Sequence, residues 1–237
     1  MNETGNDRRT SGDDALLRWQ RKQAHYQDPA VVARYDAERG FARDRATAST
    51  RWKWAAIERH LLRELPAGAR VLDVPCGTGR FTRAWLGADV SLVNADLSLA
   101  MLAAARDAGG AHSTARGGLA GSVRCDAGHL PFADASFDAV VSVRFLFHVP
   151  RQLRAAFLRE YARVSRRFVL VDVRHKYCWT TQSKRLRAWL TRARAPTPRY
   201  SLRDIDADLA AAGLVQRARL WRSPLFSEKM LVVCEKR

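Results

Sequence analysis

Short apolar runs alternate with segments of helical periodicity along most of this chain. Runs of this kind, bounded by turn residues, are typical of strands that are buried on both faces of a parallel sheet. Because helical segments separate the first five runs, the pattern predicts an α/β fold with a mostly parallel sheet. The expected strands cover residues 71–74, 90–96, 122–126, 137–143, 168–173, 214–221 and 230–234.

The segments between these runs carry apolar residues at intervals of three and four, which predicts amphipathic helices. At the start of the last helix, Ser201 and Asp204 resemble a capping box with Asp in place of Glu. The glycine-rich stretch 109–121 predicts a surface loop without catalytic residues. The expected helices cover residues 54–65, 99–108, 152–165 and 201–213.

The polar, mixed-charge residues 1–14 are expected to form a disordered tail, followed by a helical extension over 15–66. One α/β domain over 67–237 then accounts for a sizeable core in a chain of 237 residues. The last two strands follow each other closely, which favours an antiparallel hairpin at the end of the sheet. Residues 175–200 form a basic insertion that is longer than a connection of this type needs.

The first expected strand runs directly into a glycine-rich turn and then a helical pattern, over residues 71–81. The strand delivers the turn to the carboxyl edge of the sheet, and glycines allow the backbone to approach a ligand closely. The second strand ends in Asp96, 19 residues after Gly77, where a carboxylate can accept both hydroxyl groups of a ribose. The third strand ends in Asp126. These features predict a nucleotide-type site.

This succession resembles the class I S-adenosylmethionine-dependent methyltransferases, in particular the small-molecule branch that includes ubiquinone and menaquinone biosynthesis enzymes. The resemblance covers residues 51–173 well and the remainder loosely. It implies a Rossmann-like, doubly wound, mostly parallel seven-stranded sheet with an antiparallel C-terminal hairpin strand and an N-terminal helical lid. It also implies S-adenosyl-L-methionine as the cofactor, with no metal.

In that family, the acid that opens the first loop and the loop glycines lie under the methionine part of the cofactor. This implies roles for Asp73, Gly77 and Gly79, with Pro75 in the same loop. Pro75 departs from the family pattern, which generally has glycine there, and proline lacks a backbone donor. The departure bears on cofactor affinity.

The resemblance also assigns the adenosine half of the cofactor. Asp96 would bind the ribose, with Leu97 against the adenine, whereas Asp126 would meet the adenine amino group with Ala127 beside it. Val143, at the end of the fourth strand, completes the implied cofactor site.

A nicotinamide-binding Rossmann domain is the rival interpretation of the same residues. That fold requires a third glycine so that the helix packs closely against the strand, and in this chain Thr82 occupies that position. The missing glycine and the C-terminal hairpin favour the methyltransferase.

Two histidines are candidate general bases, because methyl transfer to a hydroxyl or an amine requires loss of a proton. His148 follows the fourth strand and His175 follows the fifth. For each of them a plain hydrogen-bonding role is the alternative, and it is the more common role for a histidine at the start of a loop. Arg144 is a candidate partner for an acidic group of the substrate or for the cofactor carboxylate, and a structural salt bridge is the alternative.

Aromatic side chains of the extension are candidates for the acceptor pocket, since leading helices in related enzymes fold over the cleft as a lid. Tyr26, Tyr35 and Phe41 are the residues concerned, and packing of the helices against the core is the alternative. Trp179, in the basic insertion, is a further candidate.

The formal net charge of +17 is distributed unevenly. Residues 1–143 hold 19 basic and 17 acidic residues, whereas residues 144–237 hold 22 and 7. This asymmetry favours anionic partners such as nucleic acid, an anionic membrane surface or an acidic metabolite. A genome that encodes arginine at solvated positions is the alternative, because only 6 of the 41 basic residues are lysine.

The sequence thus predicts a methyltransferase that acts on a small, anionic or amphiphilic acceptor. Its expected location is the cytoplasm or, as a peripheral protein, the inner membrane surface. An RNA methyltransferase that binds phosphates with its basic C-terminal half is one alternative, and a non-catalytic methyltransferase-like binding module is another. The Asn-Pro-Pro-Tyr type motif of exocyclic-nitrogen methylation is missing after the fourth strand, where residues 142–145 read Ser-Val-Arg-Phe. For the basic insertion, membrane contact, nucleic-acid binding and a structural lid are all open.

Overall fold

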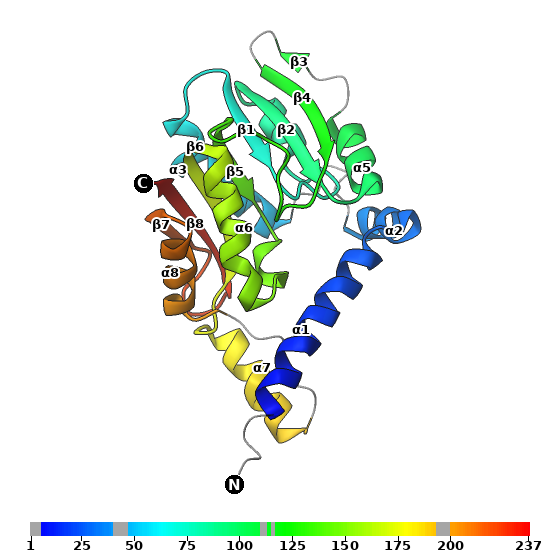
Figure 1. Ribbon diagram of the computed structural model, residues 1–237, viewed down its shortest axis with the longest axis vertical. Helices are drawn as coiled ribbons and strands as arrows, with labels where there is room; N and C mark the ends of the chain where they lie inside the picture. Colours follow the sequence, from blue (N-terminus) through cyan, green and yellow to red (C-terminus); the bar gives the residue numbers. More distant parts are fainter. Residues whose placement is uncertain (1–5, 40–46, 110–112, 115–116, 193–199) are drawn as a thin grey trace.

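The computed structural model describes residues 6–39, 47–109, 113–114, 117–192 and 200–237. One mixed sheet runs through the molecule, with strand order β3-β4-β2-β1-β5-β6-β8-β7 and helices on both faces (Figure 1). Strands β4, β2, β1, β5 and β6 are parallel to one another, whereas β8 pairs antiparallel with β6 and β7 pairs antiparallel with β8. The predicted doubly wound, Rossmann-like fold with its C-terminal hairpin is therefore confirmed.

The strands follow the apolar runs, most of which are buried on both sides, whereas β7 at the sheet edge is mostly half-buried or exposed. The second and sixth long strands have the predicted bounds, and the two-residue β3 adds an eighth member beside β4. The strands are β1 (Ala69–Asp73), β2 (Val90–Asp96), β3 (Ser113–Thr114), β4 (Gly117–Arg124), β5 (Phe137–Ser142), β6 (Ser165–Arg174), β7 (Leu214–Trp221) and β8 (Lys229–Lys236).

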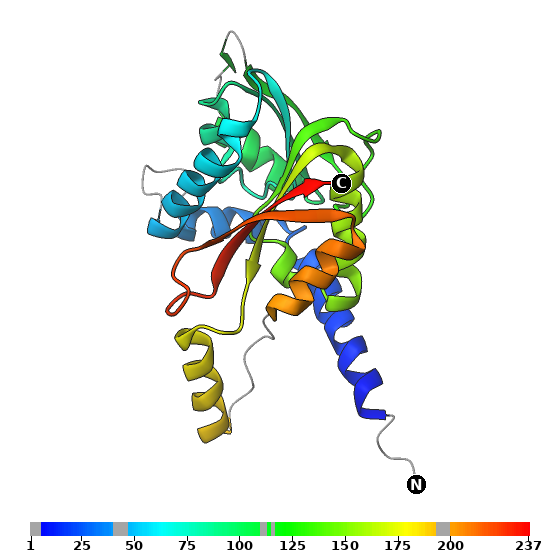
Figure 2. The ribbon, with the colours of Figure 1, turned by 90° about the vertical axis from the view of Figure 1, so that its left-hand side faces the viewer.

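Two apolar clusters hold helices on the two faces of the sheet. Residues of α3 (Ala48–His60) and α4 (Thr82–Leu86) pack on one face, and residues of α6 (Arg151–Val164) and α8 (Leu202–Ala211) pack on the other. Figure 2 shows α8 and the helix α3 on opposite sides of the twisted sheet. The remaining elements are α1 (Asn6–His25), α2 (Pro29–Arg39), η1 (Leu62–Glu64), α5 (Leu99–Gly109), η2 (Leu146–His148) and α7 (Trp179–Leu190).

Two segments differ from the sequence expectation. Strand β4 begins at Gly117, inside the stretch 109–121 that was expected to be a loop. Its glycines are accommodated because β4 pairs along β2 with a register shift between Leu92 and Val93. Helix α1 begins at Asn6, inside the segment 1–14 assigned to a disordered tail, and an Asp14–Arg18 pair one helical turn apart accompanies it.

The predicted helix starts and stops are reproduced in detail where capping chemistry was readable. Ser201 Oγ accepts from Asp204 N at 3.1 Å while the Asp204 carboxylate accepts from Ser201 N at 3.1 Å, which completes the capping box. Gly213 follows the helix with a φ of 70°, the left-handed conformation that favours glycine.

Gly79 has no room for a side chain, because its loop packs directly on α5. A Cβ built at Gly79 lies 2.7 Å from Ala105 Cα, and the φ of Gly79 is +75°. We expect Gly79→Ala to lower the free energy of unfolding by at least about 2 kcal/mol, since it combines backbone strain with a clash against a helix backbone. Chemical denaturation measures this change.

Gly121→Ala is the matched control, because nothing lies within 4 Å of a Cβ built there and its backbone is not in the left-handed region. Equal stability losses for the two variants would contradict the assigned packing of the loop on α5.

Candidate functional site

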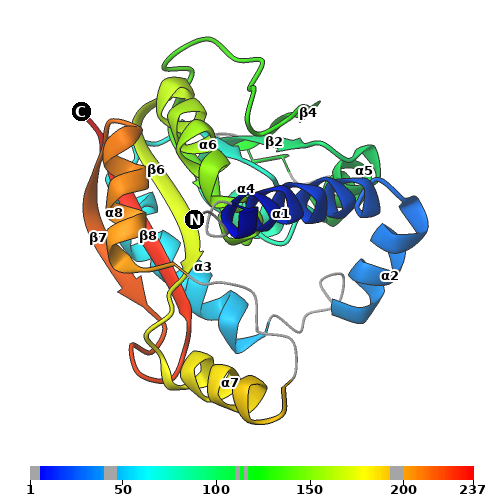
Figure 3. The same cartoon turned by 60° about the horizontal axis from the view of Figure 1, so that its bottom comes forward.

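A cavity lies at the carboxyl edge of the sheet, where the strand order reverses between β1 and β5. Open α/β sheets bind ligands at such a switch point because adjacent loops diverge there. Helix α1 crosses this edge and α2 flanks it, as Figure 3 shows with that end of the molecule brought forward. The predicted helical extension thus contributes to the walls of the cavity.

Most of the residues predicted to bind the cofactor come together in this cavity. Gly79 is the exception, since it is buried against α5 beneath the loop. The residues of the predicted set that line the cavity are Asp73, Pro75, Gly77, Asp96, Leu97, Asp126, Ala127 and Val143.

Asp96 ties the glycine-rich loop to the end of β2. Its Oδ2 accepts a hydrogen bond from Gly77 N at 2.9 Å, and its Oδ1 accepts from Ser98 N at 3.0 Å. Gly77 has a φ of +57°, so its amide turns toward the carboxylate at no steric cost. Burial raises the pKa of Asp96, although the backbone amides oppose the shift. Each oxygen retains a lone pair for a ligand hydroxyl.

Asp73 is a buried carboxylate that faces the cavity without a protein partner. It is 3% exposed, and within the described ranges no hydrogen bond or ion pair reaches its oxygens. Burial, together with the neighbouring Asp96, raises the pKa of Asp73 to about 8. Ionisation of this buried carboxyl group requires a compensating positive charge, so a ligand that places a cationic group beside Asp73 would stabilise its charged form.

Asp126 stands at the third corner of the cavity, just beyond β4. Its Oδ1 accepts from Gly128 N at 2.8 Å, which fixes the carboxylate in a local turn. His129 Nδ1 lies 3.8 Å from Oδ2. Asp126 is only half-buried, and its carboxylate is available to accept from a ligand amino group.

Arg144 lines the cavity from the loop after β5, in a strained backbone conformation with a φ of 66°. Its amide donates to Asp172 Oδ2 at 3.1 Å, and the same oxygen accepts from Lys53 Nζ. Burial lowers the pKa of Lys53 to about 8, because loss of solvation outweighs the attraction of Asp172. In the part of the chain that the structure describes, no ion pair reaches the Arg144 guanidinium. The alternative of a structural salt bridge at Arg144 therefore finds no support.

The two candidate bases occupy different surroundings. His148 lines the cavity, and its Nδ1 lies 2.7 Å from Lys22 Nζ of α1. His175 is fully buried away from the cavity, where its Nε2 contacts Ser227 O at 2.8 Å and its ring packs edge-on against Trp221. Strand β6 extends to Arg174, so the β8 hairpin covers His175 instead of leaving it at the sheet edge.

Of the described residues that were predicted to bind the acceptor, some line the cavity and one does not. Tyr26 and Tyr35 line the cavity with their rings in edge-to-face contact, at 5.8 Å between centroids. Trp179 lies on α7, 68% exposed and outside the cavity lining. Phe41 lies outside the described residues.

Several residues of the cavity wall were not predicted from the sequence, and most of them lie on α1 or in the loop after β1. Trp19 anchors α1 by edge contacts to Phe145 and Phe157, at 5.5 and 6.1 Å between centroids. The sequence of α1 gave a weak signal, because polar residues dominate the helix outside Leu16, Leu17 and Trp19. The unpredicted lining residues are Trp19, Lys22, Gln23, Gln27, Val74, Cys76, Thr78, Arg80, Phe81, Ser98, Met101, Cys125 and Phe145.

Comparison with known proteins identifies the domain. Residues 72–168 match the family model described as a methyltransferase domain. The malonyl-acyl-carrier-protein O-methyltransferase of Pectobacterium atrosepticum is 38% identical over 110 residues, which are 43% of this chain and 40% of that protein. The human protein named Probable tRNA methyltransferase 9B is 30% identical over 112 residues, 47% of this chain and 22% of that protein.

A solved structure shares the whole fold. Magnesium protoporphyrin IX methyltransferase (ChlM) from Synechocystis PCC 6803, with bound SAH, has a TM-score of 0.70 at 14% identity, covering 93% of this chain and 100% of that one. Residues 72–168 therefore match a methyltransferase domain, and the fold is shared with a methyltransferase that was solved with bound SAH and with bound SAM. The match spans less than half the length of either curated relative.

The raised pKa of Asp73 predicts a stability cost that depends on pH. An acid whose folded-state pKa is raised destabilises the fold as the pH rises from its ordinary value of 3.8 to about 8. We expect ligand-free Asp73→Asn to be more stable than the parent chain at pH 8, by at least about 1 kcal/mol. The difference should shrink toward pH 4, and thermal unfolding across this range measures it.

The same substitution should weaken S-adenosylmethionine binding, because the cationic ligand loses its counter-charge. Binding by the parent chain should strengthen from pH 6 to pH 7.5 as Asp73 ionises, and binding by Asp73→Asn should lack this dependence. A less stable Asp73→Asn chain at pH 8 would contradict the assigned cost of burying this carboxylate.

Proposed function

We propose that this protein transfers a methyl group from S-adenosylmethionine to a small-molecule acceptor that carries an anionic group. The observation that carries the proposal is the cavity ringed by Asp73, Asp96 and Asp126, of which Asp73 is buried and has no partner among the described residues. S-adenosylmethionine, when bound, supplies an electrophilic methyl group on a positively charged sulfur. Its cationic groups, ribose hydroxyls and adenine amino group suit these three carboxylates in turn.

The chain's contribution to the reaction is mainly alignment and exclusion of water. Asp96 and the Gly77 amide hold the loop that shapes the floor of the cavity, and α1 closes one side through Trp19. Tyr26 and Tyr35 present aromatic surface to an acceptor on the same side. These residues orient two reactants in a partly enclosed space.

Arg144 supplies positive charge on the acceptor side of the cavity. Its backbone is fixed by the buried Asp172, whereas its guanidinium has no carboxylate partner among the described residues. We assign it to an anionic group of the acceptor, since guanidinium pairs with carboxylate or phosphate in a defined geometry. The relative named for malonyl-acyl-carrier protein supports this choice, because a malonyl group ends in a carboxylate.

Lys22 and His148 face the acceptor as a pair. The Lys22 ammonium donates to His148 Nδ1, which leaves the proton of the neutral ring on Nε2. We assign Lys22 and His148 to positioning the acceptor, and His175 to the structure of the β8 hairpin.

Methylation of an RNA is the second candidate function. The relative named as a tRNA methyltransferase and the basic C-terminal half support it. Many basic residues of that half are engaged with acids, as in the pairs Arg163–Glu160, Arg166–Asp138 and Arg167–Glu235. Residues 144–237 still hold 22 basic against 7 acidic residues, so the preference for the small-molecule acceptor rests on the cavity and on Arg144. RNA binding that collapses with added salt would favour the second candidate.

Removing the Asp96 carboxylate should release the cofactor. We expect Asp96→Ala to weaken S-adenosylmethionine binding at least about tenfold, because a hydrogen-bonded ligand loses its acceptor and the Gly77 amide loses its anchor. Isothermal titration calorimetry measures the affinity. Asp107→Ala is the control, since Asp107 is an exposed acid on α5 outside the cavity lining. Unchanged affinity in folded Asp96→Ala would remove Asp96 from the site.

Arg144→Ala should weaken the use of the acceptor without weakening the binding of S-adenosylmethionine. After a labelled-methyl screen of a metabolite extract has identified an acceptor fraction, we expect the variant to raise the acceptor KM at least about tenfold. The affinity for S-adenosylmethionine should stay within about twofold of the parent value. A loss of cofactor affinity instead would assign Arg144 to the cofactor carboxylate, and label entering only RNA would contradict the small-molecule acceptor.

A further inference from the structure

Helix α7 turns its apolar face away from the protein. Trp179, Leu186, Trp189 and Leu190 fall within one stripe at helical spacing, and they are 68%, 56%, 76% and 67% exposed. The face toward the protein body carries Thr181, which is buried. A helix that belongs only to a folded core does the opposite, so this stripe requires another explanation.

The neighbouring β7–β8 turn extends the apolar surface. Leu225 and Phe226 at its tip are 68% and 67% exposed, and Leu225 O accepts from Trp179 N at 2.7 Å. Tyr177, just before the helix, is 52% exposed. We call these seven residues the α7 surface: Tyr177, Trp179, Leu186, Trp189, Leu190, Leu225 and Phe226. Exposed apolar side chains gathered on one helix and the turn bonded to it are typical of an interaction site.

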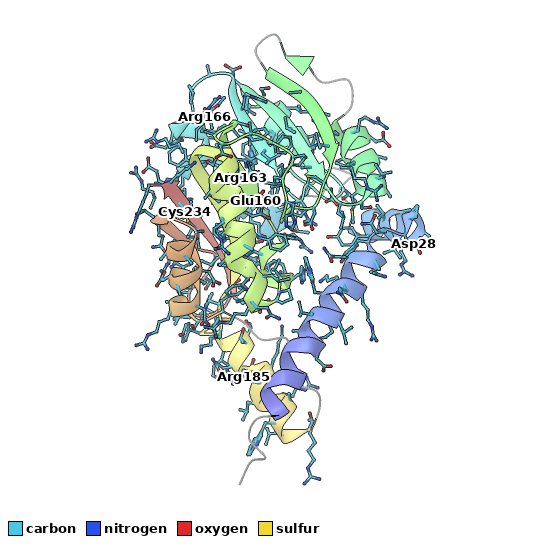
Figure 4. The ribbon with its side chains drawn as sticks, in the orientation of Figure 1. Asp28, Glu160, Arg163, Arg166, Arg185 and Cys234 are labelled. Carbon is cyan, nitrogen blue, oxygen red and sulfur yellow. The ribbon has the colours of Figure 1, made fainter. Side chains whose placement is uncertain are left out.

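Positive charge borders the α7 surface without local compensation. Residues 176–192 contain five basic residues and no acidic one. Arg185 projects from α7 at the end of the molecule opposite β3 (Figure 4). Within the described residues, the side chains of Lys184, Arg185, Arg187 and Arg192 take part in no ion pair, in contrast to the arginines of α6 and β6.

The position of α7 brings this surface to the end of the molecule where the carboxyl edge of the sheet opens. Strand β6 leads directly toward the helix, and α1 extends toward the same end (Figures 1 and 3). A partner seated on the α7 surface would therefore lie on the side of the molecule that carries the cavity.

We propose that the α7 surface binds an anionic lipid bilayer. The combination of tryptophan, leucine and phenylalanine on one face with arginine and lysine at its borders suits the boundary between headgroups and acyl chains. No described helix is both long and apolar enough to cross a bilayer, so the contact is interfacial. Basic residues near the apolar stripe add attraction to acidic headgroups. The proposal stands on this surface alone and does not depend on the methyltransferase reaction.

Sedimentation of the full chain with vesicles tests the proposal. We expect binding to vesicles with about one third phosphatidylglycerol to exceed binding to pure phosphatidylcholine at least about tenfold. Trp179→Ala/Trp189→Ala should weaken the binding at least about tenfold. Arg185→Ala/Arg187→Ala should weaken it about thirtyfold and reduce its sensitivity to salt, since each basic residue contributes about a factor of five.

The matched control is Leu99→Ala/Arg106→Ala, which removes one exposed apolar and one exposed basic residue from α5. This variant should bind vesicles as the parent chain does. Tryptophan emission provides a second readout, because it should shift to shorter wavelength on adding anionic vesicles. The shift should disappear in Trp179→Phe/Trp189→Phe, which retains the apolar character and guards against misfolding.

Three results would overturn the proposal. The first is no binding to anionic vesicles, and the second is equal loss of binding in the α5 control. The third is a different occupant of the same surface, either a second copy of this chain, seen as a dimer in analytical ultracentrifugation, or an RNA. In that case the tryptophan substitutions would abolish the dimer or the RNA complex, and the protein would not bind vesicles.

Discussion

The candidate site depends on the hydrogen bond from Gly77 N to the Asp96 carboxylate. This bond joins the loop after β1 to the end of β2, two segments separated by 19 residues in the chain but adjacent in the sheet. With Ser98 N on the other oxygen, it orients one carboxylate and one glycine-rich turn toward a common space. The remaining cavity walls, from α1 to the loop after β5, are arranged around that fixed corner.

This arrangement lowers the stability of the fold mainly through the burial of Asp73. Most buried polar groups in proteins are paired, and Asp96 follows that rule, whereas Asp73 relies on a ligand for its counter-charge. A fold that accepts an uncompensated carboxylate at the switch point of its sheet sacrifices stability for binding. The buried Asp172 contrasts with it, because Lys53 and the Arg144 amide satisfy one of its oxygens from within the protein.

The sequence predicted the sheet and its acidic corners because both depend on local patterns, such as the buried run of β2 that ends in Asp96. It could not place α1, since polar residues dominate that helix and give its contact face at Trp19 only a weak signal. The sequence identified the basic insertion that contains Trp179 but could not show that its apolar residues face outward, because direction depends on tertiary packing. His175 follows the fifth long strand as predicted, whereas its burial beside the β6–β8 pair depends on long-range pairing that the sequence does not show.

A co-crystal structure with S-adenosylhomocysteine is the most direct test that the three carboxylates hold an adenosine-bearing cofactor. The account predicts the ribose hydroxyls within hydrogen-bonding distance of Asp96, the adenine amino group beside Asp126 and the methionine-derived ammonium beside Asp73. Density for the ligand elsewhere, or a cavity that stays empty at saturating ligand, would contradict it.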